Sequence, residues 1–186
     1  NRGLRLPDGP DSDGRPDPTM RMDLSEDELV AAISRVLSGT DPSVVVGIGD
    51  DAAVLEPTTG QLVLTTDLLV EGVHFELASI SARDLGAKAV TVNVSDVAAM
   101  GGSPRAALAA IALTPEVEPP WVMELYGGMR DACAEYAVSL VGGDTNRGSL
   151  LVVSVTVTGE VARGRAVTRA GARPGDAIVA TGWLGA

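Results

Sequence analysis

Aspartates stand within or directly after several apolar runs of this sequence. They are Asp50 and Asp51 after VVVGIG, Asp67 after LVLTT, Asp96 within a longer apolar stretch, and Asp144 after SLVGG. The ends of strands in α/β folds are where ligands gather, and carboxylates that converge there repel one another unless cations lie between them. Oxygen ligands without neighbouring His or Cys favour a hard ion. This spacing therefore predicts Mg²⁺.

Hydroxyl side chains beside Asp67 extend this set of oxygen donors. Magnesium usually takes one or two carboxylates and fills its octahedron with water and phosphate oxygens. The aspartates together with Thr65 and Thr66 therefore predict more than one Mg²⁺ around a polyphosphate. Each Asp that follows Gly has a plainer interpretation as a turn former or helix cap. Asp96 lies on an apolar element, where a lone buried charge is costly, so it predicts a metal or a structural hydrogen bond.

Two glycine-rich segments bear on nucleotide binding. GIG (47–49) lacks the third glycine of a dinucleotide fingerprint, and the sequence contains no G-x-x-x-x-G-K-[ST] loop. GGDT (142–145) fits another mode, in which backbone N–H groups approach phosphate while Asp144 holds a metal; a tight turn is the alternative. Arg165 and Arg169 are either phosphate-gripping guanidinium groups or solvated charges.

The composition limits the class of protein. A length of 186 residues, 45% of them hydrophobic, suffices for a domain with its own core. A net charge of −11 and five aromatic residues argue against nucleic acid as a partner. The single cysteine, Cys133, excludes an intramolecular disulfide, and the single histidine, His74, is by type more often a surface or packed residue than a catalyst. Without a spanning apolar run or a signal peptide, we expect a cytoplasmic protein with no membrane partner.

Hydrophobic spacing and capping residues predict the elements that must position these side chains. Residues 1–21, dense in Pro, Gly and Asp, predict a disordered tail. Helices are predicted over about 25–37, 82–100 and 119–137. Strands are predicted over 44–48, 52–55, 62–66, 106–113, 139–141, 150–157 and 177–181. This mixture predicts an α/β (α+β) fold in which a mixed β-sheet packs against two long helices.

Five collinear segments resemble the thiamine-monophosphate kinase family, whose superfamily includes aminoimidazole ribonucleotide synthetase and selenophosphate synthetase. They are GIGDDAAVL (47–55), TTDLLVEGVHF (65–75), DLGAKAVTVNVSDVAAMGGSP (84–104), LVGGDTNRG (140–148) and RAVTRAGARPGD (165–176). The resemblance implies the N-terminal domain of the aminoimidazole ribonucleotide synthetase-like fold. That ATP- and magnesium-binding domain would cover residues 22–175, and residues 176–186 would begin a second domain missing from this fragment. A homodimer paired through the sheets is also implied.

The activity implied by this resemblance is ATP-dependent phosphorylation of thiamine monophosphate to thiamine diphosphate. The implied metal ligands are Asp51, Thr65, Thr66, Asp67, Asp96 and Asp144; Gly143, Asp144 and Arg169 would contact ATP, and His74 the thiamine phosphate. No catalytic side chain is implied, because joining two anions mainly requires charge neutralisation and in-line positioning. Two alternatives stay open: a sister-family ATP-dependent synthetase or ligase, and a non-catalytic module that binds Mg²⁺ and nucleotide and dimerises.

Overall fold

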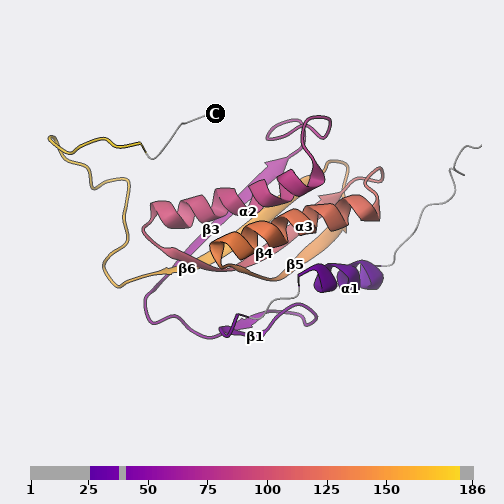
Figure 1. The fold of residues 1–186 in the computed structure, drawn as a ribbon, viewed down its shortest axis with the longest axis horizontal. Helices are drawn as coiled ribbons and strands as arrows, with labels where there is room; N and C mark the ends of the chain where they lie inside the picture. Colours follow the sequence, from indigo (N-terminus) through magenta and orange to yellow (C-terminus); the bar gives the residue numbers. More distant parts are fainter. Residues whose placement is uncertain (1–25, 38–40, 181–186) are drawn as a thin grey trace, which may run out of the picture.

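A computed structural model of the chain describes residues 26–37 and 41–180 (Figure 1). The predicted tail over residues 1–21 and residues 181–186 lie outside the described residues. The elements are α1 (Glu26–Val36), β1 (Val44–Val46), β2 (Val54–Leu55), β3 (Gln61–Val70), α2 (Ala82–Ala99), β4 (Ser103–Leu113), α3 (Pro119–Tyr136), β5 (Ser139–Arg147) and β6 (Val152–Val161). The three predicted helices are confirmed to within one residue at their described ends.

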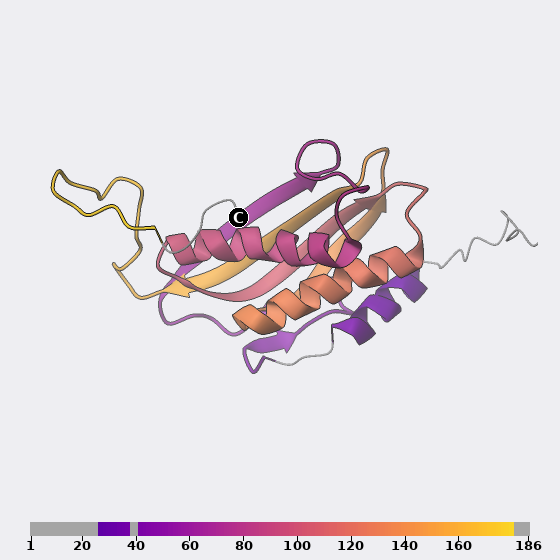
Figure 2. The same cartoon turned by 45° about the horizontal axis from the view of Figure 1, so that its top comes forward.

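Four strands form a mixed sheet in the order β3-β6-β4-β5. β6 runs antiparallel to both β3 and β4, whereas β4 and β5 are parallel and are joined through α3. α2 and α3 lie side by side across one face of this sheet, and α1 packs beside α3 (Figures 1 and 2). β1 and β2 form a small antiparallel pair of their own. The predicted mixed sheet packed against two long helices is confirmed.

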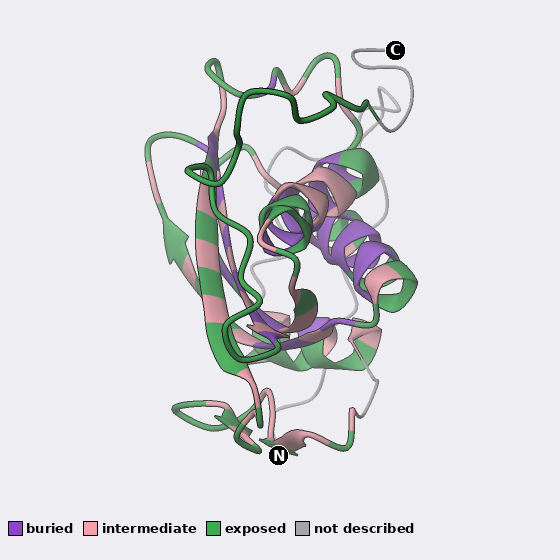
Figure 3. Cartoon of the chain, turned by 90° about the vertical axis from the view of Figure 1, so that its left-hand side faces the viewer, coloured by how far each residue is buried: buried purple, intermediate pink, exposed green. Residues whose placement is uncertain are grey.

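The two faces of the sheet have different surroundings. Along β6, Val153, Val155 and Val157 are buried under the helices, and the alternate residues point the other way. Figure 3 shows the helices on one side of the sheet, and no described helix covers the opposite side, which we name the open face. The open face carries exposed leucines of β3 and β4, namely Leu62, Leu64, Leu68 and Leu108.

Glycines allow α2 and α3 to approach backbone to backbone. A Cβ placed on Gly86 would lie 2.0 Å from the carbonyl oxygen of Leu125, and one on Gly128 would lie 1.8 Å from that of Arg83. Beside this crossing, the Arg83 guanidinium pairs with Glu124 at 3.3 Å and also with Asp131 on α3. The crossing therefore fixes where α2 lies over β3 and β6.

Local signals define where α2 begins, but they underestimated the edge strands. Ser81 Oγ accepts a hydrogen bond from the Asp84 N–H at 3.0 Å, which confirms the predicted cap. β3 and β5 were predicted to stop before Asp67 and Asp144, and both strands continue through these residues. Both are edge strands, where only one side of the backbone must pair and a polar side chain can reach solvent. The prediction that these aspartates follow their strands was therefore wrong.

The predicted strand over 177–181 was also wrong for residues 177–180, which have no strand structure. Ile178 and Val179 are almost fully exposed. No described strand lies beside them, and a β-branched run without a partner has no ladder to join.

Candidate functional site

The oxygen donors of β3 and α2 meet where these two elements lie side by side. Thr65 and Asp67 pair in register with Val157 and Val155, so their side chains lie on the helix-covered face. Thr65 Oγ1 donates a hydrogen bond to Asp96 Oδ2 at 2.9 Å. We name Thr65, Asp67 and Asp96 the carboxylate flank.

Asp96 is exposed on α2, so the expectation of a buried charge there was wrong. The apolar residues around it in the sequence, such as Val94 and Val97, face the core, while Asp96 faces outward beside β3. Its hydrogen bond to Thr65 supplies the structural partner that was one of the two expectations. Two carboxylates with a hydroxyl, and no nitrogen or sulfur ligand, are a donor set that fits Mg²⁺.

Thr66 and Asp144 lie on the open face instead. Thr66 Oγ1 donates to the Val155 carbonyl at 3.2 Å and is bonded to Thr156 Oγ1 at 2.9 Å. Asp144 Oδ2 accepts a hydrogen bond from Asn146 Nδ2 at 2.6 Å. Asp144 is on β5, at the edge of the sheet opposite to β3, so one chain does not bring it to the carboxylate flank.

Asp51 and Arg169 lie apart from both groups. Asp51 is exposed in the loop between β1 and β2, where its N–H donates to Asp50 Oδ1 at 2.8 Å. Arg169 is exposed in the segment after β6. This segment contacts the C-terminal end of α2, where the Val167 N–H donates to the carbonyl of the capping residue Met100 at 3.0 Å. Within residues 26–37 and 41–180, no three His, Cys, Asp or Glu side chains group to hold a metal. The expected convergence of all the aspartates is therefore absent from the described part of a single chain.

A tight loop after β3 fixes His74. The Val70 N–H donates to His74 Nδ1 at 3.0 Å, so Nε2 carries the proton of the neutral ring. Lys88 on α2 donates from Nζ to the His74 carbonyl at 2.8 Å. Lys88 was not among the predicted residues, although it is the single lysine among the 14 basic residues of the chain, which is the one signal that marks it.

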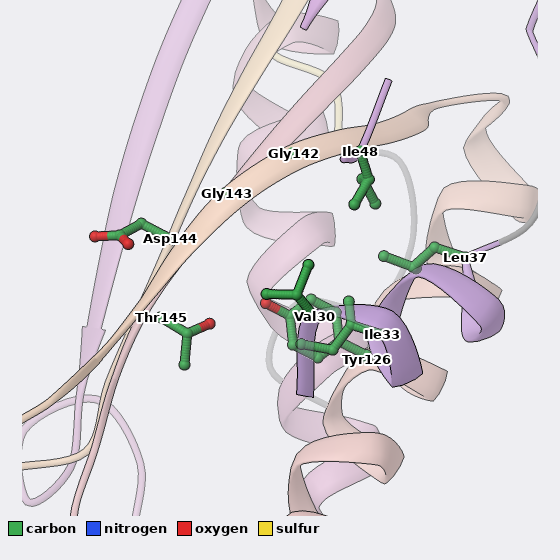
Figure 4. A pocket seen from close by; sticks show the side chains of 9 residues that line it. All are labelled: Val30, Ile33, Leu37, Ile48, Tyr126, Gly142, Gly143, Asp144 and Thr145. Atoms are coloured by element: carbon green, nitrogen blue, oxygen red, sulfur yellow. The ribbon is translucent and has the colours of Figure 1, made fainter. Parts of the chain in front are cut away.

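A small apolar cavity lies beside the GGDT segment (Figure 4). It measures about 100 Å³ and is lined by Val30, Ile33, Leu37, Ile48, Tyr126, Gly142, Gly143, Asp144 and Thr145. Asp144 and Thr145 point to opposite sides of β5, and Thr145 faces the cavity side with Tyr126. Burial is the largest effect on Tyr126 and raises the pKa of its phenol, while a hydrogen bond with Thr145 opposes this shift without cancelling it. The phenol therefore stays protonated. The contribution of α1 to this cavity was not predicted.

None of the helices in the described part of the chain is both long and apolar enough to cross a bilayer.

Comparison with known proteins assigns the chain to a family. Residues 49–161, more than half of the chain, match the family described as AIR synthase related protein, N-terminal domain. The chain belongs to this family. Among its relatives, the thiamine-monophosphate kinase of Bacillus subtilis (strain 168) is 43% identical over 145 residues, which are 77% of this chain and 45% of the relative. That of Escherichia coli (strain K12) is 42% identical over 166 residues, which are 88% of this chain and 50% of the relative.

Solved structures give the same result. The crystal structure of thiamine-monophosphate kinase from Stenotrophomonas maltophilia K279a has a TM-score of 0.64 and 37% identity, covering 79% of this chain and 45% of that chain. AaThiL complexed with AMPPCP and TMP has a TM-score of 0.59 and 40% identity, covering 84% of this chain and 48% of that chain. The fold and the resemblance predicted from the sequence are confirmed. The chain spans about half the length of the curated relatives it matches.

Proposed function

We propose that the complete protein transfers the γ-phosphoryl group of ATP to the phosphate of thiamine monophosphate, releasing ADP and forming thiamine diphosphate. The carboxylate flank is the observation that carries this proposal, because two carboxylates and a hydroxyl lie together on one edge of the domain. Similarity to thiamine-monophosphate kinases at about 40% identity supports the choice of substrates. The complex of AaThiL with AMPPCP and TMP adds support.

The reaction joins two anions, so the protein must hold them in line and offset their charge. An oxygen of the acceptor phosphate forms a bond to the γ-phosphorus while the bond from that phosphorus to the bridging oxygen of ADP breaks. Asp67 and Asp96 would hold Mg²⁺, and bound Mg²⁺ would supply neutralisation of the phosphate charges. Thr65 orients the Asp96 carboxylate through its hydrogen bond, and His74 offers its Nε2–H to the acceptor phosphate. No general base is required in this proposal.

The nucleotide is proposed to lie against β5. Gly143 is the proposed backbone contact to phosphate; its lack of a side chain also lets β5 lie close to β4, because a Cβ at this position would lie 1.9 Å from the Ala109 carbonyl oxygen. Asp144 and Arg169 are the other proposed ATP contacts, and Asp51, Thr66 and Asp144 the further metal ligands.

We further propose a homodimer formed through the open faces and a cytoplasmic location, where ATP is available. Exposed fractions of 64% for both Leu62 and Leu64 and 52% for Leu68 leave apolar surface that a second copy would bury. Thr66 and Asp144 lie on this same face, so pairing of two copies would place proposed ligands at their interface.

The test is formation of thiamine diphosphate and ADP by the complete protein from ATP, Mg²⁺ and thiamine monophosphate. Asp96→Asn is expected to lower kcat by at least about a hundredfold. Asp84→Asn is the matched control, because it makes the same change at the other end of α2, where the carboxylate bonds Ser81. Turnover of an aminoimidazole precursor or selenide instead of thiamine monophosphate would overturn the proposal, and so would full activity of Asp96→Asn.

A further inference from the structure

Every hydrogen-bonding group of His74 except one is already engaged. Its backbone N–H donates to the Val70 carbonyl at 2.9 Å, its ring Nδ1 accepts from the Val70 N–H, and its carbonyl accepts from Lys88. In the part of the chain that the structure describes, only Nε2 has no partner. The loop therefore presents this one N–H, and the exposed side chain directs it to whatever lies outside.

The Val70 N–H occupies a special place in the sheet. β3 is an edge strand, and the Glu71 N–H donates to the Leu151 carbonyl of the chain leading into β6 at 3.1 Å. Because donors alternate along a strand, the Val70 N–H points outward, away from β6, where the ladder offers no acceptor. His74 Nδ1 accepts a hydrogen bond from this N–H, so one contact both satisfies the unpaired backbone donor of the edge strand and fixes the imidazole ring.

Lys88 is the contact that ties this loop to a helix. The turn is otherwise held by bonds within residues 70–75, by the bond from the Glu71 N–H to the Leu151 carbonyl and by buried Phe75, with Gly72 at a φ of +76°. Lys88 Nζ reaches the His74 carbonyl from fourteen residues further along the chain. A lysine suits this contact, because its compact ammonium on a flexible stem donates to a single oxygen, while Arg presents a planar fork suited to two.

We infer that Lys88 is a positioning residue for the acceptor phosphate: its bond to the His74 carbonyl holds the Nε2–H of His74 toward a phosphate monoester. This role rests on the proposed function, since it names how the acceptor contact of that reaction is held in place. Lys88 acts here through His74 and not by touching substrate. Lys88 is a half-buried residue of α2, and its Nζ already donates to the His74 carbonyl at 2.8 Å.

The first measurement needs no activity. Amide exchange of the Val70 N–H, followed by NMR on the 186-residue chain, reports whether His74 Nδ1 is held in place. Lys88→Met, which keeps the apolar stem, is expected to speed this exchange about tenfold, and Lys88→Arg, which keeps a cationic donor, is expected to speed it less. Arg83→Met is the matched control: it removes a positive charge from the same helix, but its partners are on α3. Unchanged Val70 exchange in Lys88→Met would overturn the positioning role.

The second measurement uses the complete protein with ATP and thiamine monophosphate. Lys88→Met is expected to raise KM for thiamine monophosphate about tenfold, equivalent to about 1.4 kcal/mol, with kcat and KM for ATP unchanged. In a double-mutant cycle, adding Lys88→Met to His74→Ala should not raise KM for thiamine monophosphate further, because both changes act on the same contact between His74 and the acceptor phosphate. Additive effects would show that Lys88 binds phosphate itself and would overturn the inference. Faster Val70 exchange with KM unchanged in both single variants would support the anchoring and overturn the acceptor contact of the proposed function.

Discussion

Gly128→Ala tests the crossing that places α2 over the sheet. The added methyl group would lie 1.8 Å from the Arg83 carbonyl oxygen and 2.7 Å from its carbonyl carbon. Since close contacts between carbon and oxygen are about 3.3 Å or longer, α2 and α3 would have to separate by roughly 1.5 Å. The Arg83 carbonyl belongs to the backbone of α2, so it cannot yield without moving the helix.

The expected magnitude follows from two opposing effects. Alanine is favoured over glycine in a helix by about 1 kcal/mol, and overpacking that moves backbone costs about 3 kcal/mol or more. Gly128→Ala should therefore lower the free energy of unfolding by about 2 kcal/mol. At the neighbouring Gly127, a Cβ meets only Arg83 Nη1 at 2.9 Å, the end of a flexible and exposed side chain. Gly127→Ala should therefore be neutral or up to about 1 kcal/mol more stable than the wild type.

Urea unfolding followed by far-ultraviolet circular dichroism distinguishes the two variants. The expected order of midpoints places Gly127→Ala at or above the wild type and Gly128→Ala below it. Gly86→Ala gives a second, independent test from the other helix, because its Cβ would lie 2.0 Å from the Leu125 carbonyl oxygen. If Gly128→Ala and Gly86→Ala unfold at the wild-type midpoint, the two helices are not in backbone contact and the reasoning fails.

Three further predictions concern the core and the open face. Burial raises the pKa of the Cys133 thiol from 9.0 to about 12. The unfolded chain therefore loses this proton first, and the free energy of unfolding falls as the pH rises from 9.0 towards about 12. In urea titrations over this pH range, Cys133→Ala should lose less stability than the wild type. Asn93 is fully buried, and its Oδ1 has no hydrogen-bond partner in the described structure. Asn93→Leu should therefore raise the free energy of unfolding by about 1 kcal/mol. A free energy of unfolding below that of the wild type, measured by calorimetry, would contradict this. Leu64→Lys should shift the sedimentation coefficient of the complete protein from dimer to monomer; an unchanged dimer would exclude pairing through the open face.

The helices were predictable because their signals are local. Ser81 with Asp84 caps α2, and Pro119 and Pro120 begin α3, and each of these residues acts on backbone groups within one turn. The strand lengths were not predictable in the same way. Asp67 and Asp144 are residues that favour turns, but pairing of β3 with β6 and of β5 with β4 keeps them in strands. Such pairing depends on partners far along the chain, which local composition does not encode.

The candidate site was predictable in residue type and only partly in placement. Thr65 and Thr66 are adjacent, and the alternation of a strand sends one toward Asp96 and the other to the open face. The bond from Lys88 to His74 depends on how α2 packs, and the cavity around Tyr126 depends on how α1 packs. Residue spacing in the sequence therefore does not predict either feature.

The two ends of the site are linked through a single helix. Lys88 and Asp96 are eight residues apart on α2, or about 12 Å along its axis. Asp96 accepts a hydrogen bond from Thr65 within β3, and Lys88 donates one to the His74 carbonyl in the loop that follows β3. α2 is thus pinned twice to the same edge strand, with Asp67 on the strand between the two points. A separation of α2 from α3 in Gly128→Ala should therefore disturb both bonds at once. Faster exchange of the Val70 N–H in that variant, beyond what Gly127→Ala produces, is the expected sign of this coupling.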